Sequence, residues 1–154
     1  MIGHLPQSVI AMTSEECLNR IIVSVPGSGV SRVGIVGSRK FANRELVESF
    51  VRLCGAMYGA DTHIVSGGCV GVDTWAADAA ESLGLHVVEF LPKTKTREGY
   101  FARNKQIADN CDLLVAFIPK GQERSGAWNT CNWRRKAGLT YFVFDEEGQR
   151  WNRW

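Results

Sequence analysis

The sequence predicts an α/β fold in which helices wind on both faces of a five-stranded, mainly parallel sheet. From residue 32 onward, short apolar segments alternate with longer segments of helical periodicity. Connections that contain a helix join parallel strands by right-handed crossovers, which place helices on both faces of the sheet. With 154 residues, 45% hydrophobic and 22% charged, the chain has the size and composition of one domain with a single core. We therefore expect a doubly wound, three-layer sandwich.

The expected strands are short runs rich in Val, Ile, Leu and Phe. They cover residues 32–38, 62–67, 86–92, 112–119 and 140–145. The expected helices between them cover residues 43–59, 72–84, 99–111 and 125–138. In the first helix, Leu46, Phe50, Leu53 and Met57 recur every three or four residues, and Asn43 is placed to cap it. Gly84 and Gly138 follow two of the helices, where glycine commonly ends a helix.

The two ends of the chain lie outside this alternation. We expect residues 1–31 to form an N-terminal extension with a short helix, capped by Thr13 and Glu16, and a linker over 26–31. Residues 146–154 look like a surface tail that exposes Trp151 and Trp154. Association of the chain with itself through this tail is an alternative that the sequence leaves open. The predicted domain therefore covers residues 32–145.

Charge and cysteine content limit the class of protein. The net charge of +2 does not indicate an extended nucleic-acid face, although a local basic patch remains compatible with it. The five cysteines are widely spaced and form no CxxC pair, which favours reduced thiols over a zinc site or a disulfide framework. The sequence has neither a signal-peptide pattern nor an apolar run long enough to cross a membrane. We expect a cytoplasmic protein with no metal, no required cofactor and no membrane partner.

The candidate site lies in the loops after the first, second and fourth strands. Open parallel sheets bind ligands beyond the carboxyl ends of their strands. The second loop, "SGGCVGVD", contains Gly67, Gly68 and Gly71 and runs directly into a helix, where amide N–H groups attract an anion. Ser66 adds a hydroxyl group, while Asp73 either caps the helix or accepts hydrogen bonds from ribose. The alternative is a plain tight turn with Asp73 as its cap, and both interpretations stay open.

The other two loops and the helix expected over residues 99–111 add polar groups. Ser38 and Arg39 follow the first strand, and the guanidinium group of arginine suits phosphate. Ser125 and Gly126 open the last helix as a second anion cradle. Arg103 and Asn104 follow Tyr100 and Phe101, two aromatic residues that either stack on a base or pack in the core. Arg134, Arg135 and Lys136 fit a solvated helix end.

The sequence shows no catalytic constellation. Asp73 is the best-placed carboxyl group for acid–base chemistry, and Glu123 is a much less favoured second candidate. Cys69 has no evident companion base, so we do not expect it to be a nucleophile. His63 and His86 begin strands at the opposite rim, and together with isolated His4 they are interpreted as structural.

Three motifs together resemble the SLOG superfamily, which joins the DNA-processing protein DprA (Smf) to the LOG nucleotide phosphoribohydrolases. They are "VGIVGSRKF", "IVSGGCVGVDTWAADAA" and "ARNKQIADNCDLLVAFIPKGQERSGAWNT", in this order, within residues 32–145. The chain looks most like the small stand-alone YspA/YpsA-like branch. The resemblance implies a Rossmann-like fold that binds a nucleotide or a nucleotide-derived ligand. It implies these ligand-binding positions: Gly37, Ser38, Arg39, Ser66, Gly67, Gly68, Gly71, Val72, Asp73, Arg103, Asn104, Ser125 and Gly126.

The sequence departs from the LOG pattern at one catalytic position. LOG enzymes carry a PGGxGTxxE element, whereas this chain reads "PKGQERSGAWNT", with Thr130 at the position of the glutamate. Loss of that carboxyl group argues against LOG-like hydrolysis of an N-glycosidic bond. We therefore expect a nucleotide sensor or sequestering module, with LOG-like hydrolysis as one alternative. Single-stranded DNA binding of the DprA type is another, and nucleic acid is the less favoured partner.

Overall fold

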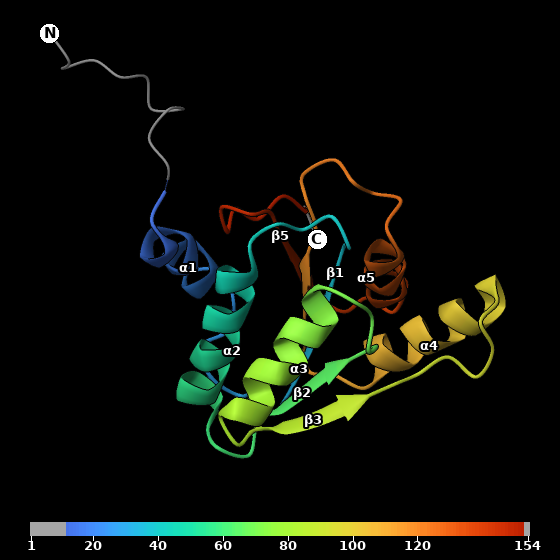
Figure 1. Ribbon diagram of the computed structural model, residues 1–154, viewed down its shortest axis with the longest axis horizontal. Helices are drawn as coiled ribbons and strands as arrows, with labels where there is room; N and C mark the ends of the chain where they lie inside the picture. The colour runs from blue at the N-terminus through green and yellow to red at the C-terminus, as the bar shows by residue number, and fades with distance from the viewer. Residues whose placement is uncertain (1–11, 153–154) are drawn as a thin grey trace, which may run out of the picture.

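The computed structural model describes residues 12–152 and shows a three-layer α/β sandwich (Figure 1). Five strands alternate with helices: β1 (Arg32–Gly37), β2 (His63–Ser66), β3 (His86–Glu89), β4 (Leu113–Phe117) and β5 (Tyr141–Phe144). All the pairings between them are parallel, in the order β3-β2-β1-β4-β5. The predicted fold class is confirmed, and the sheet is wholly rather than mainly parallel.

The helices lie close to their expected positions. They are α1 (Ser14–Ile22), α2 (Arg44–Tyr58), α3 (Val72–Ser82), α4 (Arg97–Asp109) and α5 (Gly126–Lys136). Thr13 and Glu16 form the predicted capping box of α1, and Asn43 Oδ1 accepts a hydrogen bond from Leu46 N. The start of α4 differs from the expectation, because Thr96 rather than a later residue caps it. Polar residues 93–98 obscured this start in the sequence.

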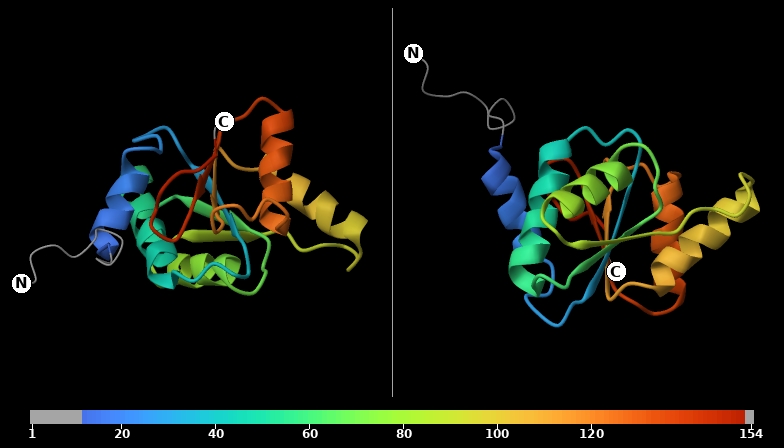
Figure 2. Two further views of the ribbon diagram at one scale, coloured as in Figure 1. Left: turned by 90° about the horizontal axis from the view of Figure 1, so that it is seen from above. Right: turned by 60° about the horizontal axis from the view of Figure 1, so that its bottom comes forward.

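The sheet separates two apolar cores. Along β4, alternate side chains enter opposite cores, with Val115 and Phe117 on one face and Leu114 and Ala116 on the other. Helices α1, α2 and α3 cover the first face, while α4 and α5 cover the second (Figure 2). Because the first core also includes Cys17 and Ile21 of α1, this helix packs onto the sandwich although it precedes the predicted domain.

The tail folds back along β5. Trp151 N donates to Val143 O, and its indole Nε1 donates to Ile118 O at 2.9 Å. Its ring stacks on Trp128 of α5, with the ring centroids 5.0 Å apart. Trp151 is therefore half-buried, contrary to the expected exposed position. Trp154 and His4 lie outside the described residues.

Arg134 also departs from the expectation of a solvated helix end. It is 4% exposed, and its guanidinium group donates to the carbonyl groups of Cys111 and Thr140 at 2.9 Å each. These bonds hold α5 against the amino ends of β4 and β5. His63 and His86 stack at the same end of the sheet, as the structural interpretation predicts. Among the residues described, no helix is both long and apolar enough to span a membrane.

Candidate functional site

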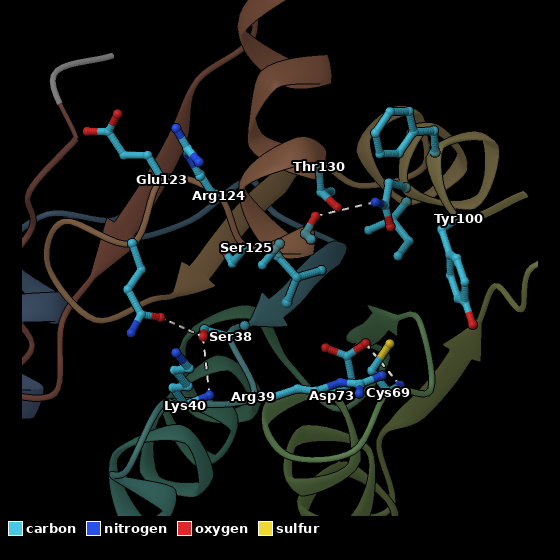
Figure 3. A pocket seen from close by; sticks show the side chains of 18 of the residues that line it. Ser38, Arg39, Lys40, Cys69, Asp73, Tyr100, Glu123, Arg124, Ser125 and Thr130 are labelled. Carbon is cyan, nitrogen blue, oxygen red and sulfur yellow. Dashed lines mark hydrogen bonds between the residues drawn. The ribbon is translucent and has the colours of Figure 1, made fainter. Parts of the chain in front are cut away.

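A cavity of about 930 Å³ opens beyond the carboxyl ends of β1 and β4. The chain builds the sheet outward from β1 to β3 and then crosses to β4, so strand order reverses between β1 and β4. Parallel sheets leave a crevice at such a point, because the connections leave in opposite directions. The cavity walls come from the loops after β1, β2 and β4 together with α4 and the start of α5 (Figure 3). The cavity lies where the sequence predicts a site.

The cavity lining carries more positive than negative charge. Its basic residues are Arg39, Lys40, Arg97, Arg103 and Arg124, and its acidic residues are Asp73 and Glu123. For a chain whose net charge is only +2, this is a local concentration of positive charge. All the basic residues except Arg103 are exposed at the rim. The lining therefore favours an anionic group near the mouth of the cavity.

Two half-exposed aromatic residues form one wall. Tyr100 and Phe101 lie in the first turns of α4 and are each 36% exposed. The guanidinium group of Arg103 lies 5.6 Å from the ring centroid of Tyr100, and that of Arg97 lies 5.1 Å from the ring centroid of Phe101. These rings lie on the cavity wall rather than in the core, so packing in the core is wrong, and stacking on a base stays a prediction.

The glycine-rich turn after β2 encloses a carboxyl group of the protein itself. Asp73 Oδ2 accepts hydrogen bonds from Gly67 N at 3.0 Å and Cys69 N at 3.2 Å. These two amides are therefore not free for an anion, which corrects the expectation for this part of the turn. Helix α3 begins at Val72, and its N-cap residue Gly71 provides no side-chain cap. Asp73 instead orders the turn that precedes its own helix.

Gly67 is needed because Arg103 approaches the turn closely. A Cβ atom at Gly67 would lie 2.7 Å from Arg103 Nη1 and 3.1 Å from Asp73 Oδ2. Arg103 is 5% exposed and its Nη1 donates to Gly67 O at 2.6 Å. Its Nε donates to Asn104 Oδ1, and its Nη2 to Cys69 Sγ. Arg103 thus ties α4 to the turn, and Gly68 and Gly71 supply backbone angles of positive φ, 70° and 96°.

Asp73 combines deep burial with one unpartnered oxygen. It is 5% exposed, and within the described part of the chain its Oδ1 makes no hydrogen bond. Burial raises the pKa of Asp73 to about 6 from its ordinary value of 3.8, against the opposing effects of the Cys69 and Gly67 amides and of Arg103. In Figure 3 the carboxyl group points toward the open space below Ser125 and Thr130. A carboxyl group with this pKa is suited to proton transfer near neutral pH.

Two further walls come from the loops after β1 and β4. Ser38 Oγ donates to Gln122 Oε1 at 2.9 Å and accepts from Lys40 N, so it links the two loops. Gly37 allows β1 to pass α3, because a Cβ atom there would lie 2.3 Å from a methyl group of Val72. Val72 is accordingly buried in the first core rather than exposed to the cavity.

The start of α5 forms the wall opposite Asp73. Ser125 Oγ caps the helix by accepting from Trp128 N at 3.3 Å, while Asn104 Nδ2 donates to Gly126 O. Thr130, one turn further along, is 1% exposed, and its Oγ1 has no hydrogen-bond partner among the described residues. Thr130 belongs to the cavity lining, but its hydroxyl oxygen is fully buried and is therefore not presented to a ligand (Figure 3).

The structure brings most of the sequence-predicted site together. The predicted residues that line the cavity are Gly37, Ser38, Arg39, Asp73, Arg103, Asn104, Ser125 and Gly126. Those that do not are Ser66, Gly67, Gly68, Gly71 and Val72. Ser66 is fully buried, and its Oγ has no partner among the residues described. The glycines act behind the wall, where they shape the turn that holds Asp73.

Several lining residues were outside the predicted set. They are Val36, Lys40, Cys69, Arg97, Tyr100, Phe101, Ile107, Gly121, Gln122, Glu123, Arg124, Ala127 and Thr130. Arg97 lies within the first turn of α4, which the sequence assigned to a loop. The signal that finds it is Thr96, a capping residue directly before it. Within residues 12–152, no three His, Cys, Asp or Glu side chains gather as metal ligands.

Comparisons with known proteins agree with this architecture. The structure is similar to the X-ray structure of DNA processing protein A (DprA) from Streptococcus pneumoniae, with a TM-score of 0.63 and 20% identity. The similarity covers 83% of this chain and 58% of that chain, so this chain spans less than two thirds of its length. At this identity the likeness is one of fold, which is Rossmann-like. A search among curated proteins gave no match.

A family model gives the more specific result. The model of DNA recombination-mediator protein A matches residues 24–110, which is more than half of the chain. The match contains β1, β2, β3 and the helices between them, together with the glycine-rich turn and Arg103. This chain therefore belongs to the family of DNA recombination-mediator protein A, the DprA family.

Proposed function

We propose that this chain binds a nucleotide or a nucleotide-derived phosphorylated ligand in the cavity beyond β1 and β4, as a sensor or sequestering module. The observation that carries the proposal is the cavity itself, which is large enough for such a ligand and has a basic rim and an aromatic wall. Its polar groups come from separate loops that a rigid parallel sheet positions. The finer resemblance to the YspA/YpsA-like branch stays a prediction, as does a cytoplasmic location.

The roles of the lining residues follow from their chemistry. Arg39, Lys40 and Arg124 surround the mouth, where they are placed to neutralise phosphate oxygens. Tyr100 and Phe101 offer ring faces for a base. The buried polar groups lie deeper, where they are placed to meet the uncharged part of the ligand. This division explains how one cavity accommodates the charged and the uncharged halves of a nucleotide.

Isothermal titration with nucleoside mono- and diphosphates, cyclic nucleotides and ADP-ribose tests the proposal. We expect at least one of these ligands to bind, and Arg39→Ala to weaken that binding about tenfold, because it removes a charge-assisted hydrogen bond. Arg52→Ala is the matched control, since Arg52 is exposed on α2 and outside the cavity lining. Chromatography of the same samples reports whether the ligand is also hydrolysed, with Asp73 as the acid or base.

Two results would contradict the proposal. One is the absence of binding across the ligand panel, and the other is an equal effect of Arg39→Ala and Arg52→Ala. Single-stranded DNA is the second candidate ligand, because the family description names a DNA recombination mediator. If DNA is the ligand, oligonucleotides bind far more tightly than mononucleotides, and their affinity falls steeply as salt is raised. The basic rim supports both candidates, whereas the enclosed, acceptor-bearing floor favours the smaller ligand.

A further inference from the structure

The deep part of the cavity presents acceptor oxygens, in contrast to its basic rim. Asn104 Oδ1 is occupied by Arg103 Nε, and Gln122 Oε1 is occupied by Ser38 Oγ. Asp73 Oδ1 has no hydrogen-bond partner among the described residues, and it is not one of the fully buried unpartnered atoms, so the cavity reaches it. An acceptor that opens on a cavity binds water, and a ligand that displaces this water keeps the hydrogen bond only if it supplies a donor. The floor therefore favours a ligand with a hydrogen-bond donor at this position.

The position of this oxygen is fixed by the surrounding hydrogen bonds. Two backbone amides hold Asp73 Oδ2, which leaves the carboxyl group little freedom to rotate. Arg103 makes no hydrogen bond to Oδ1 among the described residues, and its guanidinium group donates instead to Gly67 O, Phe90 O, Asn104 Oδ1 and Cys69 Sγ. A fixed acceptor discriminates between ligands better than a mobile one, because no conformational entropy of the acceptor is lost on binding.

The chemistry of a nucleotide restricts which of its groups satisfies Asp73. A phosphate group carries negative charge, so the carboxylate repels it. The basic residues at the rim are the groups that attract a phosphate. A sugar hydroxyl group is a neutral donor, and carboxylates accept hydrogen bonds from ribose hydroxyls in other parallel sheets that bind nucleotides. Thr130 Oγ1, on the facing wall, is fully buried, so the polar contact that the floor offers to a sugar is made by Asp73 Oδ1.

We propose that Asp73 selects ribonucleotides over 2′-deoxyribonucleotides through a hydrogen bond from the sugar 2′-hydroxyl group to Oδ1. This inference rests on the proposed function, whose ligand it narrows to nucleotides with an intact ribose. It also separates this chain's ligand from DNA, whose sugars lack the 2′-hydroxyl group.

Titration with matched pairs of ribo- and 2′-deoxyribonucleoside 5′-monophosphates of adenine, guanine, cytosine and uracil tests the inference. We expect the deoxy member of each binding pair to bind at least about tenfold more weakly, because a hydrogen bond to a charged group is lost. In Asp73→Asn, the amide oxygen replaces Oδ2 on the turn and the amide nitrogen faces the cavity as a donor. The 2′-hydroxyl group then accepts from a neutral amide instead of donating to a charged oxygen, so the preference for ribose is expected to fall to about threefold or less.

Asp78→Asn is the matched control, since it makes the same substitution at an exposed position of α3 outside the cavity lining and should leave the preference unchanged. Equal binding of the ribo and deoxy members by the unmodified protein overturns the inference and leaves the proposed function standing. Retention of the full preference in a folded Asp73→Asn variant also overturns it. If no nucleotide binds, the proposed function fails and the inference fails with it. Should Asp73→Asn not fold, the preference of the unmodified protein decides the question.

Discussion

The turn that contains Gly67 and precedes Asp73 shows that one sequence pattern is compatible with two structures, an anion site and a turn closed by a carboxyl group of the protein. A glycine-rich turn before a helix is typical of anion sites, and the same turn is equally suited to a carboxyl group of the protein. Here Asp73 takes that place, and Gly67 leaves room for Arg103, which is 36 residues away along the chain. The sequence locates the turn and offers Asp73 as one of the two groups that fill it. The spacing within the motif carries no information about the contact of Arg103 with the same turn.

The buried carboxyl group makes a testable contribution to stability. Because the pKa of Asp73 is higher in the folded protein, at about 6, than its ordinary 3.8, the folded state holds the proton more tightly than the unfolded state. The free energy of unfolding therefore contains a term that is favourable at about pH 4 and is lost as pH rises through 6. The full difference is about 3 kcal/mol.

Asp73→Asn removes this term. As pH rises from 4 to 7.5, we expect the unmodified protein to lose up to about 3 kcal/mol more free energy of unfolding than the variant loses. Urea unfolding at both pH values measures it. Parallel pH profiles for the two proteins would show that the Asp73 carboxyl group ionises equally easily in the folded and unfolded states.

At the scale of the elements, periodicity and capping residues predicted the strands and helices well. Thr13, Asn43 and Ser125 each cap the helix expected to follow them, because a helix start depends on a few neighbouring residues. Arg134 was misjudged because its partners, the carbonyl groups of Cys111 and Thr140, lie on segments that only the tertiary fold brings together. Local pattern therefore indicates where an element begins, but not which of its charges become buried.

Arg134→Lys tests whether this buried guanidinium group holds α5 in place. An ammonium group lacks the planar fork that reaches several carbonyl groups at once, so buried acceptors lose their donors. We expect a loss of about 2–4 kcal/mol in the free energy of unfolding, measured by urea denaturation. Arg52→Lys, on the exposed surface of α2, should change it by no more than about 0.5 kcal/mol. Equal effects of the two substitutions would mean that the buried contacts contribute little.

For the whole molecule, the sequence predicted the layered architecture and the edge of the sheet that carries the cavity. Both follow from strand and helix order, since alternation along the chain determines which ends of the strands meet. The ends of the chain were less predictable. α1 adds Ile21 to the core, and Trp151 packs on Trp128. Neither contact was predictable, because apolar residues near a terminus carry no local sign of what they pack against.

Trp151→Ala tests the role of the tail. The substitution removes the stacking on Trp128 and the hydrogen bond to Ile118 O, so we expect a loss of about 2 kcal/mol in stability. Urea denaturation measures that loss, and sedimentation measures the mass of the protein in solution. A lower mass with unchanged stability of the monomer would instead assign Trp151 to a surface between copies of the chain.

The cavity is lined by two stretches of chain, of which the family model matches one and not the other. The wall that holds Asp73 and Arg103 falls within residues 24–110, which the family model matches, while the facing wall from Gly121 to Thr130 falls beyond it. The loop portion of the facing wall is largely exposed, so a change there leaves the matched wall in place. Diversification of ligand preference in this architecture then requires changes over only a few consecutive residues, without rebuilding the sheet.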